Sequence, residues 1–194
     1  ALFNKLHTAD RDVRDGKWQR EANRGLELDG KTVGIIGYGH MGKAFAKKLR
    51  GFEVEVLCYD LKPTVGDENA QQVSLETLQE KSQIISLHVP HTELTYQMID
   101  ANFIRKFKQP FWLLNSARGS CVVTEDLVAA LESKTILGAG LDVLETEPPL
   151  SWKLVNHPKV FATPHIAGTS QESNLEMGRA AIDGLVQNRD CLIS

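Results

Sequence analysis

Three short polar stretches each follow an apolar run and contain ionisable side chains: Arg118 in residues 115–120, Glu145 and Glu147 in residues 142–149, and His165 in residues 163–168. A histidine titrates near neutral pH, so it can accept the proton of a hydroxyl group. A carboxylate beside it stabilises the imidazolium that forms, and an arginine fork holds a carboxylate through two parallel hydrogen bonds. If these residue types meet, they suit hydride transfer from a 2-hydroxy acid. Taken singly, Arg118 would be an ordinary surface charge and His165 an ordinary turn residue.

A glycine-rich motif nearer the N-terminus predicts a binding site for a dinucleotide. Gly37, Gly39 and Gly42 form the pattern G-x-G-x-x-G, in which the first glycine ends an apolar run and the third lies in a helical pattern. The motif alone is weak evidence, and this context is what makes it informative. Gly37 permits a tight turn, Gly39 lets the backbone approach a pyrophosphate, and Gly42 lets the helix approach the strand. The alternative is a turn in which the glycines serve chain geometry alone.

Asp60 ends the next apolar run and predicts which dinucleotide is bound. An acidic side chain at this point accepts hydrogen bonds from the ribose hydroxyls of the adenosine half. Because it also repels a 2′-phosphate, the sequence favours NAD over NADP. The free amides at the start of the helix after Gly39 would face the phosphates.

The apolar runs alternate with helical patterns, which predicts the elements that hold these motifs. Strands are expected at residues 31–37, 54–60, 84–87, 111–115, 136–143 and 160–162. Helices are expected over residues 40–50, after the caps Ser74 and Thr124, and after a capping box at residues 169–172. This alternation indicates an α/β fold, a doubly wound parallel sheet of the Rossmann type.

Further helices bracket the α/β unit at both ends of the chain. Before Gly16, apolar residues recur at helical spacing, namely Leu2, Leu6, Ala9 and Val13. The closing helix is expected to turn its apolar residues inward, namely Leu175, Ile182, Leu185 and Val186. Both helices resemble connectors to a part outside the α/β unit, and the start at Ala1 instead of Met suggests a piece of a longer chain.

Composition excludes several classes of protein. The 194 residues carry 22 basic and 25 acidic side chains, so a net charge of −3 offers nucleic acid no general attraction. No apolar stretch approaches the length of a membrane helix. The three cysteines lie far apart, which indicates neither a disulfide framework nor a zinc site and favours a reducing compartment, the cytoplasm. His88 and His91 have a metal-like spacing, but Pro90 breaks the helix that would align them, so we expect no metal.

With these motifs in this order, the chain resembles the nucleotide-binding domain of the D-isomer-specific 2-hydroxyacid dehydrogenases, the family that includes phosphoglycerate dehydrogenase. The resemblance covers essentially the whole chain and rests on residues 16–18, 32–39, 87–92, 115–119, 140–148 and 163–168. It implies NAD as the cofactor and a small D-2-hydroxy acid as the substrate, phosphoglycerate first among the candidates. The alternative is a non-catalytic NAD-sensing module, as in the family's transcriptional corepressors.

The resemblance also implies roles for individual residues. Arg118 would anchor the substrate, His165 would act as acid and base, and Glu147 would pair with His165, because the family's glutamate directly precedes a proline. Asp142 would contact the nicotinamide carboxamide. The other cofactor contacts would be the amides of His40 and Met41 at the pyrophosphate, Val89 and Pro90 near the adenosine half, and Ala117.

In the family, the nucleotide domain is inserted between two parts of a substrate domain. Residues 1–16 and 170–194 match the helices that cross between the domains. The resemblance therefore implies that residues 1–194 are the NAD-binding domain and that most of the substrate domain lies outside this chain. Because family members usually pair through the nucleotide domain, it also implies a homodimer.

Overall fold

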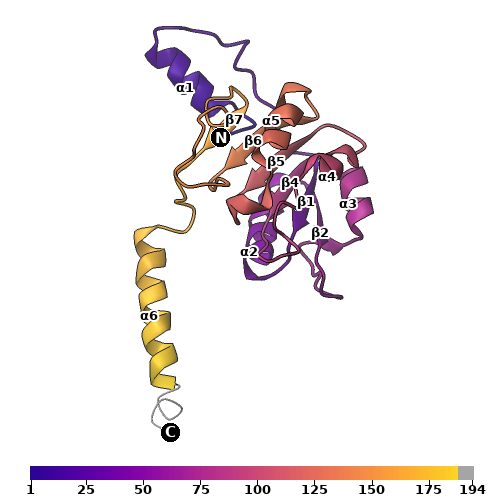
Figure 1. Ribbon diagram of the computed structural model, residues 1–194, viewed down its shortest axis with the longest axis vertical. Helices are drawn as coiled ribbons and strands as arrows, with labels where there is room; N and C mark the ends of the chain where they lie inside the picture. Colours follow the sequence, from indigo (N-terminus) through magenta and orange to yellow (C-terminus); the bar gives the residue numbers. More distant parts are fainter. Residues whose placement is uncertain (188–194) are drawn as a thin grey trace. The chain divides into compact units, whose positions relative to one another are not determined.

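A computed structural model describes the backbone of residues 1–187 and the side chains of residues 1–184 (Figure 1). The chain divides into two compact units, the first spanning Ala1–Thr163 and the second beginning at Pro164. The first unit holds the strands and helices α1 to α5, and the second holds α6 (Gln171–Gln187). Within the described range, none of the helices is long and apolar enough to cross a membrane.

A seven-stranded sheet forms the centre of the first unit. Its strands are β1 (Thr32–Ile36), β2 (Glu55–Tyr59), β3 (Gln71–Gln72), β4 (Ile84–Leu87), β5 (Phe111–Asn115), β6 (Ile136–Leu141) and β7 (Val160–Ala162). Their order is β3-β2-β1-β4-β5-β6-β7, and each neighbouring pair is parallel. The chain builds outward from β1 on one side and then returns to add β4 on the other. This reversal is a topological switch point, where open α/β sheets bind ligands.

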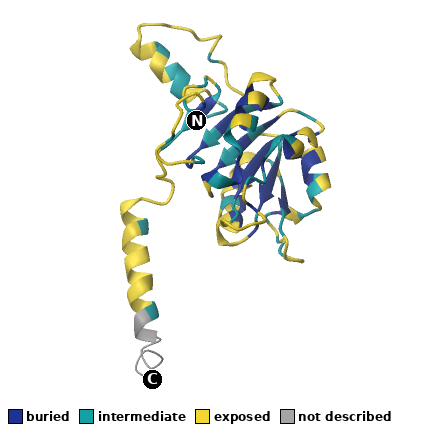
Figure 2. Cartoon of the chain, in the orientation of Figure 1, coloured by how far each residue is buried: buried dark blue, intermediate teal, exposed yellow. Residues whose placement is uncertain are grey.

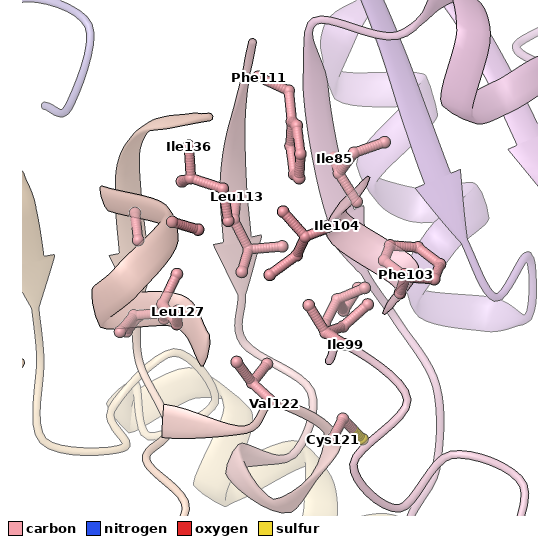
Figure 3. Packing of buried hydrophobic residues seen from close by; sticks show 14 of the residues in the cluster. Ile85, Ile99, Phe103, Ile104, Phe111, Leu113, Cys121, Val122, Leu127 and Ile136 are labelled. Carbon is pink, nitrogen blue, oxygen red and sulfur yellow. The ribbon is translucent and has the colours of Figure 1, made fainter. Parts of the chain in front are cut away.

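Helices cover both faces of the sheet, as the alternating side chains of β5 show. Phe111 and Leu113 pack in one apolar cluster with residues of α3, α4 and α5, whereas Trp112 and Leu114 pack in a second cluster with residues of α2. Figure 3 shows the first cluster, and Figure 2 shows that the buried residues concentrate on the strands. Because successive strand residues point to opposite faces, the two clusters lie on opposite sides of the sheet. The helices are α2 (His40–Leu49), α3 (Leu75–Lys81), α4 (Ala101–Arg105) and α5 (Thr124–Glu132), with short 3-10 turns η1 (Arg50–Phe52) and η2 (Gly119–Cys121).

The parallel α/β sheet expected from the sequence is confirmed, with one strand added. β3 consists of two polar residues, Gln71 and Gln72, which carry no apolar pattern that would predict a strand. It forms because β2 offers an open edge, with which it pairs at Leu57 and Cys58.

Helix α3 begins as expected, but α5 does not. The Ser74 hydroxyl accepts a hydrogen bond from the N–H of Thr77 and caps α3. Thr124 is the first residue of α5 instead of its cap, so the prediction of a hydroxyl cap there is wrong. The N–H of Thr124 donates to the carboxylate of Glu145 at 3.1 Å, and this distant side chain takes the place of a local cap.

The helices at the two ends of the chain also differ from expectation. Helix α6 is capped one residue later than the expected box, because the Ser170 hydroxyl accepts from the N–H of Ser173. Its apolar residues are not turned inward, since Leu175 and Ile182 are 56% and 62% exposed. The side chains of Leu185 and Val186 lie outside the described residues. Helix α1 (Leu6–Arg14) forms in the predicted segment but begins at Leu6, so Leu2 lies outside it, and none of the described residues of α1 is buried.

Candidate cofactor and active site

The loops that carry most of the expected site residues leave the same edge of the sheet. All strands run in one direction, so the loops after β1, β4, β5 and β6 emerge together. At the switch point, the N–H of His88 donates to the carbonyl of Ile36 at 2.8 Å. This bond holds the loop after β4, with Val89 and Pro90, beside the glycine motif after β1.

The three glycines of the motif meet different constraints. Gly37 has φ of 89°, and a Cβ there would lie 2.5 Å from the carbonyl oxygen of His88. A Cβ on Gly42 would lie 2.3 Å from the carbonyl oxygen of Gly37. In contrast, a Cβ on Gly39 would meet no described heavy atom within 4 Å. Chain geometry therefore requires Gly37 and Gly42, whereas the space at Gly39 fits a ligand that approaches the backbone.

The N-terminus of α2 lies directly beside that space. The helix begins at His40, and no side chain in the described part of the chain caps it. His40 and Met41 are both exposed. Because the first N–H groups of a helix have no partner within the helix, this turn can bind an anion. The geometry fits the pyrophosphate of a dinucleotide.

Asp60 directly follows β2, next to the glycine motif. Its Oδ2 accepts a hydrogen bond from the N–H of Tyr38 at 2.7 Å, and its Oδ1 accepts from the N–H of Lys62 at 2.9 Å. The carboxylate is therefore fixed in orientation while the residue stays partly exposed. Each carboxylate oxygen has a second lone pair, so both ribose hydroxyls could still donate to it.

Two hydrogen-bonded residues shape the loops after β4 and β5. The Thr95 hydroxyl donates to the carbonyl of Pro90 at 2.6 Å, which fixes the loop after β4. The buried Asn115 accepts from the N–H of Ala117 at 3.0 Å and donates to the carbonyl of Arg118 at 3.0 Å. Asn115 therefore folds the loop after β5 so that Ala117 is buried and Arg118 is exposed. The role of Asn115 was missed in the sequence, although a polar residue that ends an apolar strand is a signal for it.

Asp142 joins the ends of three strands. It is 8% exposed, its N–H donates to the carbonyl of Asn115 at 2.9 Å, and its Oδ1 accepts from the Thr163 hydroxyl at 2.6 Å. A buried carboxylate needs such partners because burial without them is costly. These bonds fix Asp142 at the same edge as the glycine motif.

The structure distinguishes the two glutamates that follow β6. Glu145 accepts from the N–H of Thr124 at 3.1 Å and from the side-chain amide of Gln97 at 3.3 Å. The Thr124 hydrogen bonds lower the pKa of Glu145, so it is held as a structural anion. Glu147 is exposed and accepts from the N–H of Leu144 at 3.1 Å. Of the two, Glu147 is therefore better placed to meet a substrate or a catalytic base.

His165 belongs to the second unit, which begins at Pro164. Its backbone has φ of 55°, in the left-handed region. The structure thus gathers the glycine motif, Asp60, Arg118, Asp142 and Glu147 on the first unit.

The other singled-out residues have structural partners. The Nε2 of His88 contacts the hydroxyl of Ser86 at 2.9 Å, and the Nδ1 of His91 contacts the hydroxyl of Ser120 at 2.8 Å. Among the described residues, no three histidine, cysteine or acidic side chains gather in a way that could hold a metal ion. Burial raises the pKa of the Cys121 thiol, which makes it a poor nucleophile.

A parallel sheet with a glycine motif at its switch point defines a dinucleotide-binding domain of the Rossmann type. A family model described as "D-isomer specific 2-hydroxyacid dehydrogenase, NAD binding domain" matches residues 1–167. The chain belongs to this family and is its NAD-binding domain.

Known proteins resemble the chain over nearly its whole length. It is 40% identical over 195 residues to a glyoxylate reductase of Thermofilum pendens, a match that covers 96% of this chain and 58% of the relative. It is 37% identical over 192 residues to a D-3-phosphoglycerate dehydrogenase of Archaeoglobus fulgidus, which covers 96% of this chain and 36% of the relative. The crystal structure of a glyoxylate reductase from Paecilomyes thermophila matches with a TM-score of 0.88 at 29% identity, covering 96% of this chain and 58% of that one. The chain therefore spans about 58% or less of the length of these relatives.

Proposed function

We propose that this chain is the cofactor-binding half of an NAD-dependent enzyme that interconverts a D-2-hydroxy acid and its 2-oxo acid. The observation that carries the proposal is the shared edge of the sheet. There the uncapped start of α2 and Asp60 suit NAD, and the loops after β5 and β6 present Arg118 and Glu147 beside them. A dinucleotide site on the same edge of the sheet as Arg118 and Glu147 suits the oxidation of an anionic substrate.

Each residue has a role that follows from its chemistry. Arg118 binds the substrate carboxylate through its guanidinium fork, and His165 takes the proton of the 2-hydroxyl group. Glu147 orients His165 and stabilises its protonated form. NAD, when bound, accepts the hydride. Asp142 binds the nicotinamide carboxamide, and Ala117, Val89 and Pro90 line the cofactor.

The substrate class is a small 2-hydroxy or 2-oxo acid. The relatives are named as glyoxylate reductases and D-3-phosphoglycerate dehydrogenases, and these names share a short carboxylic acid oxidised or reduced at C2. We place phosphoglycerate first among the candidates and glycerate next. Since the chain spans 58% of the glyoxylate reductase, side chains that read the rest of the substrate would lie largely on another part of the protein.

The cofactor assignment can be tested on the 194-residue chain itself. Titration of its intrinsic or NADH fluorescence should show NADH bound more tightly than NADPH. Asp60→Ser should reduce this preference, because the variant removes the charge that repels a 2′-phosphate. Equal binding of NADH and NADPH by the unaltered chain would refute the role of Asp60.

The catalytic assignment needs turnover, measured with glyoxylate, hydroxypyruvate and 3-phosphoglycerate in the longest natural form of the protein. His165→Asn should abolish turnover and leave NADH binding intact, whereas the matched control His157→Asn should keep both. Unchanged turnover in His165→Asn would overturn the mechanism. Absence of turnover in the unaltered protein, together with NADH-dependent capture of a peptide or protein partner, would favour the corepressor-like alternative. Robust turnover by the 194-residue chain alone would refute its assignment as half of an active site.

We further propose that the protein forms a homodimer in the cytoplasm. The family resemblance supports pairing, and exposed apolar residues of the N-terminal segment, such as Val13 and Trp18, provide an apolar surface for it. Cys58 and Cys121 are buried free thiols, which suits a reducing compartment.

A further inference from the structure

Tyr38, the residue between the first two glycines of the motif, binds both ends of a loop beside the cofactor site. Its backbone N–H donates to Oδ2 of Asp60 at 2.7 Å, and its phenol hydroxyl donates to Oδ1 of Asp67 at 2.7 Å. The loop between the two acids, residues 61–66, starts at the carboxylate that we assign to the ribose. One residue of the glycine motif therefore fixes both the start and the end of this loop.

The Tyr38 side chain is in a position where its hydroxyl must have a partner. The side chain is 1% exposed and packs with Cys58 and Ala70 in the apolar cluster on the α2 side of the sheet. A buried hydroxyl without a hydrogen bond would cost stability. Burial, followed by the bond to Asp67, raises the pKa of Tyr38, so the phenol stays a neutral donor.

The carboxylate of Asp67, unlike that of Asp60, is used for several contacts within the protein. Its Oδ1 also accepts from the N–H of Asn69 at 2.9 Å, and its Oδ2 lies 3.6 Å from Nζ of Lys43. The bond from Tyr38 is the first cause of the lowered pKa of Asp67. Asp67 therefore serves as an anchor for the loop, while Asp60 keeps acceptor capacity for a ligand.

The loop needs such an anchor because little else in it is buried. Leu61 is 71% exposed, and Thr64 has a left-handed φ of 55°. A second anchor holds the middle of the loop: the side-chain amide of Gln72 accepts from the N–H of Val65 at 2.8 Å and donates to the carbonyl of Lys62 at 2.9 Å. Loss of the Tyr38 anchor should therefore loosen the loop without unfolding it.

We propose that the Tyr38 hydroxyl, through its bond to Asp67, holds residues 61–66 in the conformation that receives the adenosine half of the cofactor. Tyr38 is thus a positioning residue, and the proposal rests on the assignment of NAD to this site. A ligand that binds one conformation of a loop loses affinity in proportion to the fraction of molecules in that conformation. The bond between two side chains would in this way set the affinity for the cofactor.

The direct test is Tyr38→Phe, which removes the hydroxyl and keeps the buried ring. We expect the Kd for NADH to rise about two- to tenfold, the factor that corresponds to the net worth of one hydrogen bond. The Kd for ADP-ribose should rise by the same factor, because the effect lies in the adenosine half. Both are measured on the 194-residue chain by fluorescence and calorimetry, well below its unfolding temperature. Tyr96→Phe, which removes a hydroxyl from an exposed ring elsewhere, should leave both values unchanged.

A double-mutant cycle separates positioning from general stability. Asp67→Ala also removes the contacts to Asn69 and Lys43, so it should weaken NADH binding at least as much as Tyr38→Phe does. The double variant should be no worse than Asp67→Ala alone, because the bond between Tyr38 and Asp67 is already lost there. Asp67→Asn keeps an acceptor oxygen for Tyr38 and should bind NADH within about twofold of the unaltered chain. Unchanged Kd values in Tyr38→Phe, a lowered melting temperature alone, or additive effects of the two substitutions would overturn the proposal. If the unaltered chain binds neither NADH nor ADP-ribose, the assignment of the NAD site fails as well, which distinguishes the two failures.

Discussion

At the scale of single residues, the glycine motif contains two kinds of glycine. Gly42 is required by the fold, because a Cβ there would lie 2.3 Å from a backbone oxygen. Gly39 has an extended backbone with φ of −79° that any residue can adopt, and the space beside it is open. The two positions should therefore respond differently to the same substitution.

Gly39→Ala should leave stability nearly unchanged and weaken NADH binding by about tenfold or more, because the new methyl group occupies the space for the pyrophosphate. Gly42→Ala should lower the free energy of unfolding by about 1–3 kcal/mol, the usual cost of overpacking. Gly51→Ala is the matched control, since a Cβ there also meets no described atom within 4 Å but lies at the far end of α2. Urea denaturation and NADH titration check these outcomes, and normal NADH binding by Gly39→Ala would contradict the site.

His88 lies at the switch point of the sheet, and its pKa is shifted from the ordinary value. Its ring lies 5.1 Å from that of Phe45, and its Nε2 contacts Ser86. Burial lowers the pKa of His88 from 6.5 to about 4. The folded protein therefore keeps this side chain neutral over a range of pH in which the unfolded chain protonates it.

The lowered pKa of His88 determines how the stability of the fold changes with pH. Between pH 6.5 and about pH 4 the unfolded state binds the extra proton, so acid destabilises the fold across this window and adds no further loss from His88 below it. The contribution amounts to about 3 kcal/mol at most. His88→Gln should flatten the decline in unfolding free energy from pH 6.5 to pH 4.5, as measured by urea titration at several pH values. Parallel curves for the two proteins would show that His88 does not titrate in this way.

Single residues of the candidate site can be named from the sequence where a short motif identifies them. The glycines, Asp60 and the residues that resemble the family's site were all named from sequence. Asp67, Asn115 and Glu145 were not assigned their observed roles, because each acts through a partner that is fixed only in the folded chain. The bond between Tyr38 and Asp67, for example, links residues 29 positions apart.

At the scale of elements, helix α5 shows how a side chain distant in sequence replaces a cap at the start of the helix. The N–H of its first residue, Thr124, donates to Glu145, which follows β6, and the Thr124 hydroxyl does not cap the helix. The same carboxylate accepts from Gln97 in the segment before α4. A Cβ on Gly119 would lie 1.8 Å from the carbonyl oxygen of Leu144, so the loops after β5 and β6 touch here. Glu145 thus joins α5 to the loop that carries Glu147.

Glu145→Gln should lower the free energy of unfolding by about 1 kcal/mol at pH 7, the typical worth of a helix cap. The folded-state pKa of Glu145 is lowered from 4.5, so its contribution is complete above that value and disappears as the pH falls through the lower one. The difference between variant and unaltered chain should therefore shrink at pH 4 and below. Glu125→Gln, an exposed acid in the first turn of the same helix, should change stability by less than about 0.5 kcal/mol. Equal losses of unfolding free energy in Glu145→Gln and Glu125→Gln would show that the bond between Glu145 and Thr124 makes no specific contribution.

Strands were more predictable than helix boundaries. Each apolar run became a strand, because burial against helices on both faces demands it. The two-residue strand β3 had no such run and depends on the edge of β2. The cap of α6 differed by one residue because two neighbouring hydroxyls, Thr169 and Ser170, could each have served. The sequence signals for a helix cap are local, whereas the group that caps the helix depends on the folded chain.

At the scale of the whole molecule, the residues proposed to bind the cofactor and the residue proposed to transfer the proton belong to different units. Every expected cofactor residue from Gly37 to Asp142 lies in Ala1–Thr163, whereas His165 follows the boundary. Hydrogen bonds within the first unit, including that from Thr163 to Asp142, help to shape these loops. The first unit should therefore be sufficient for binding.

A chain that ends after Thr163 should fold and bind NADH within about threefold of the 194-residue chain, a change of less than 1 kcal/mol. Its thermal unfolding should stay cooperative, because the sheet and both apolar clusters are retained. Calorimetry and NADH titration provide the measurements. A folded truncated chain that has lost NADH binding would show that residues beyond Thr163 complete the cofactor site.

The two-residue strand β3 has a consequence for how the folded domain behaves at high concentration. Sheet edges with unpaired N–H and carbonyl groups invite another strand and can seed aggregates. Here the edge is short, and the side-chain amide of Gln72 already engages the N–H of Val65 and the carbonyl of Lys62. Because β3 is only two residues long, a strand from a neighbouring molecule would find few backbone groups to pair with, which limits fibre-like growth on this side.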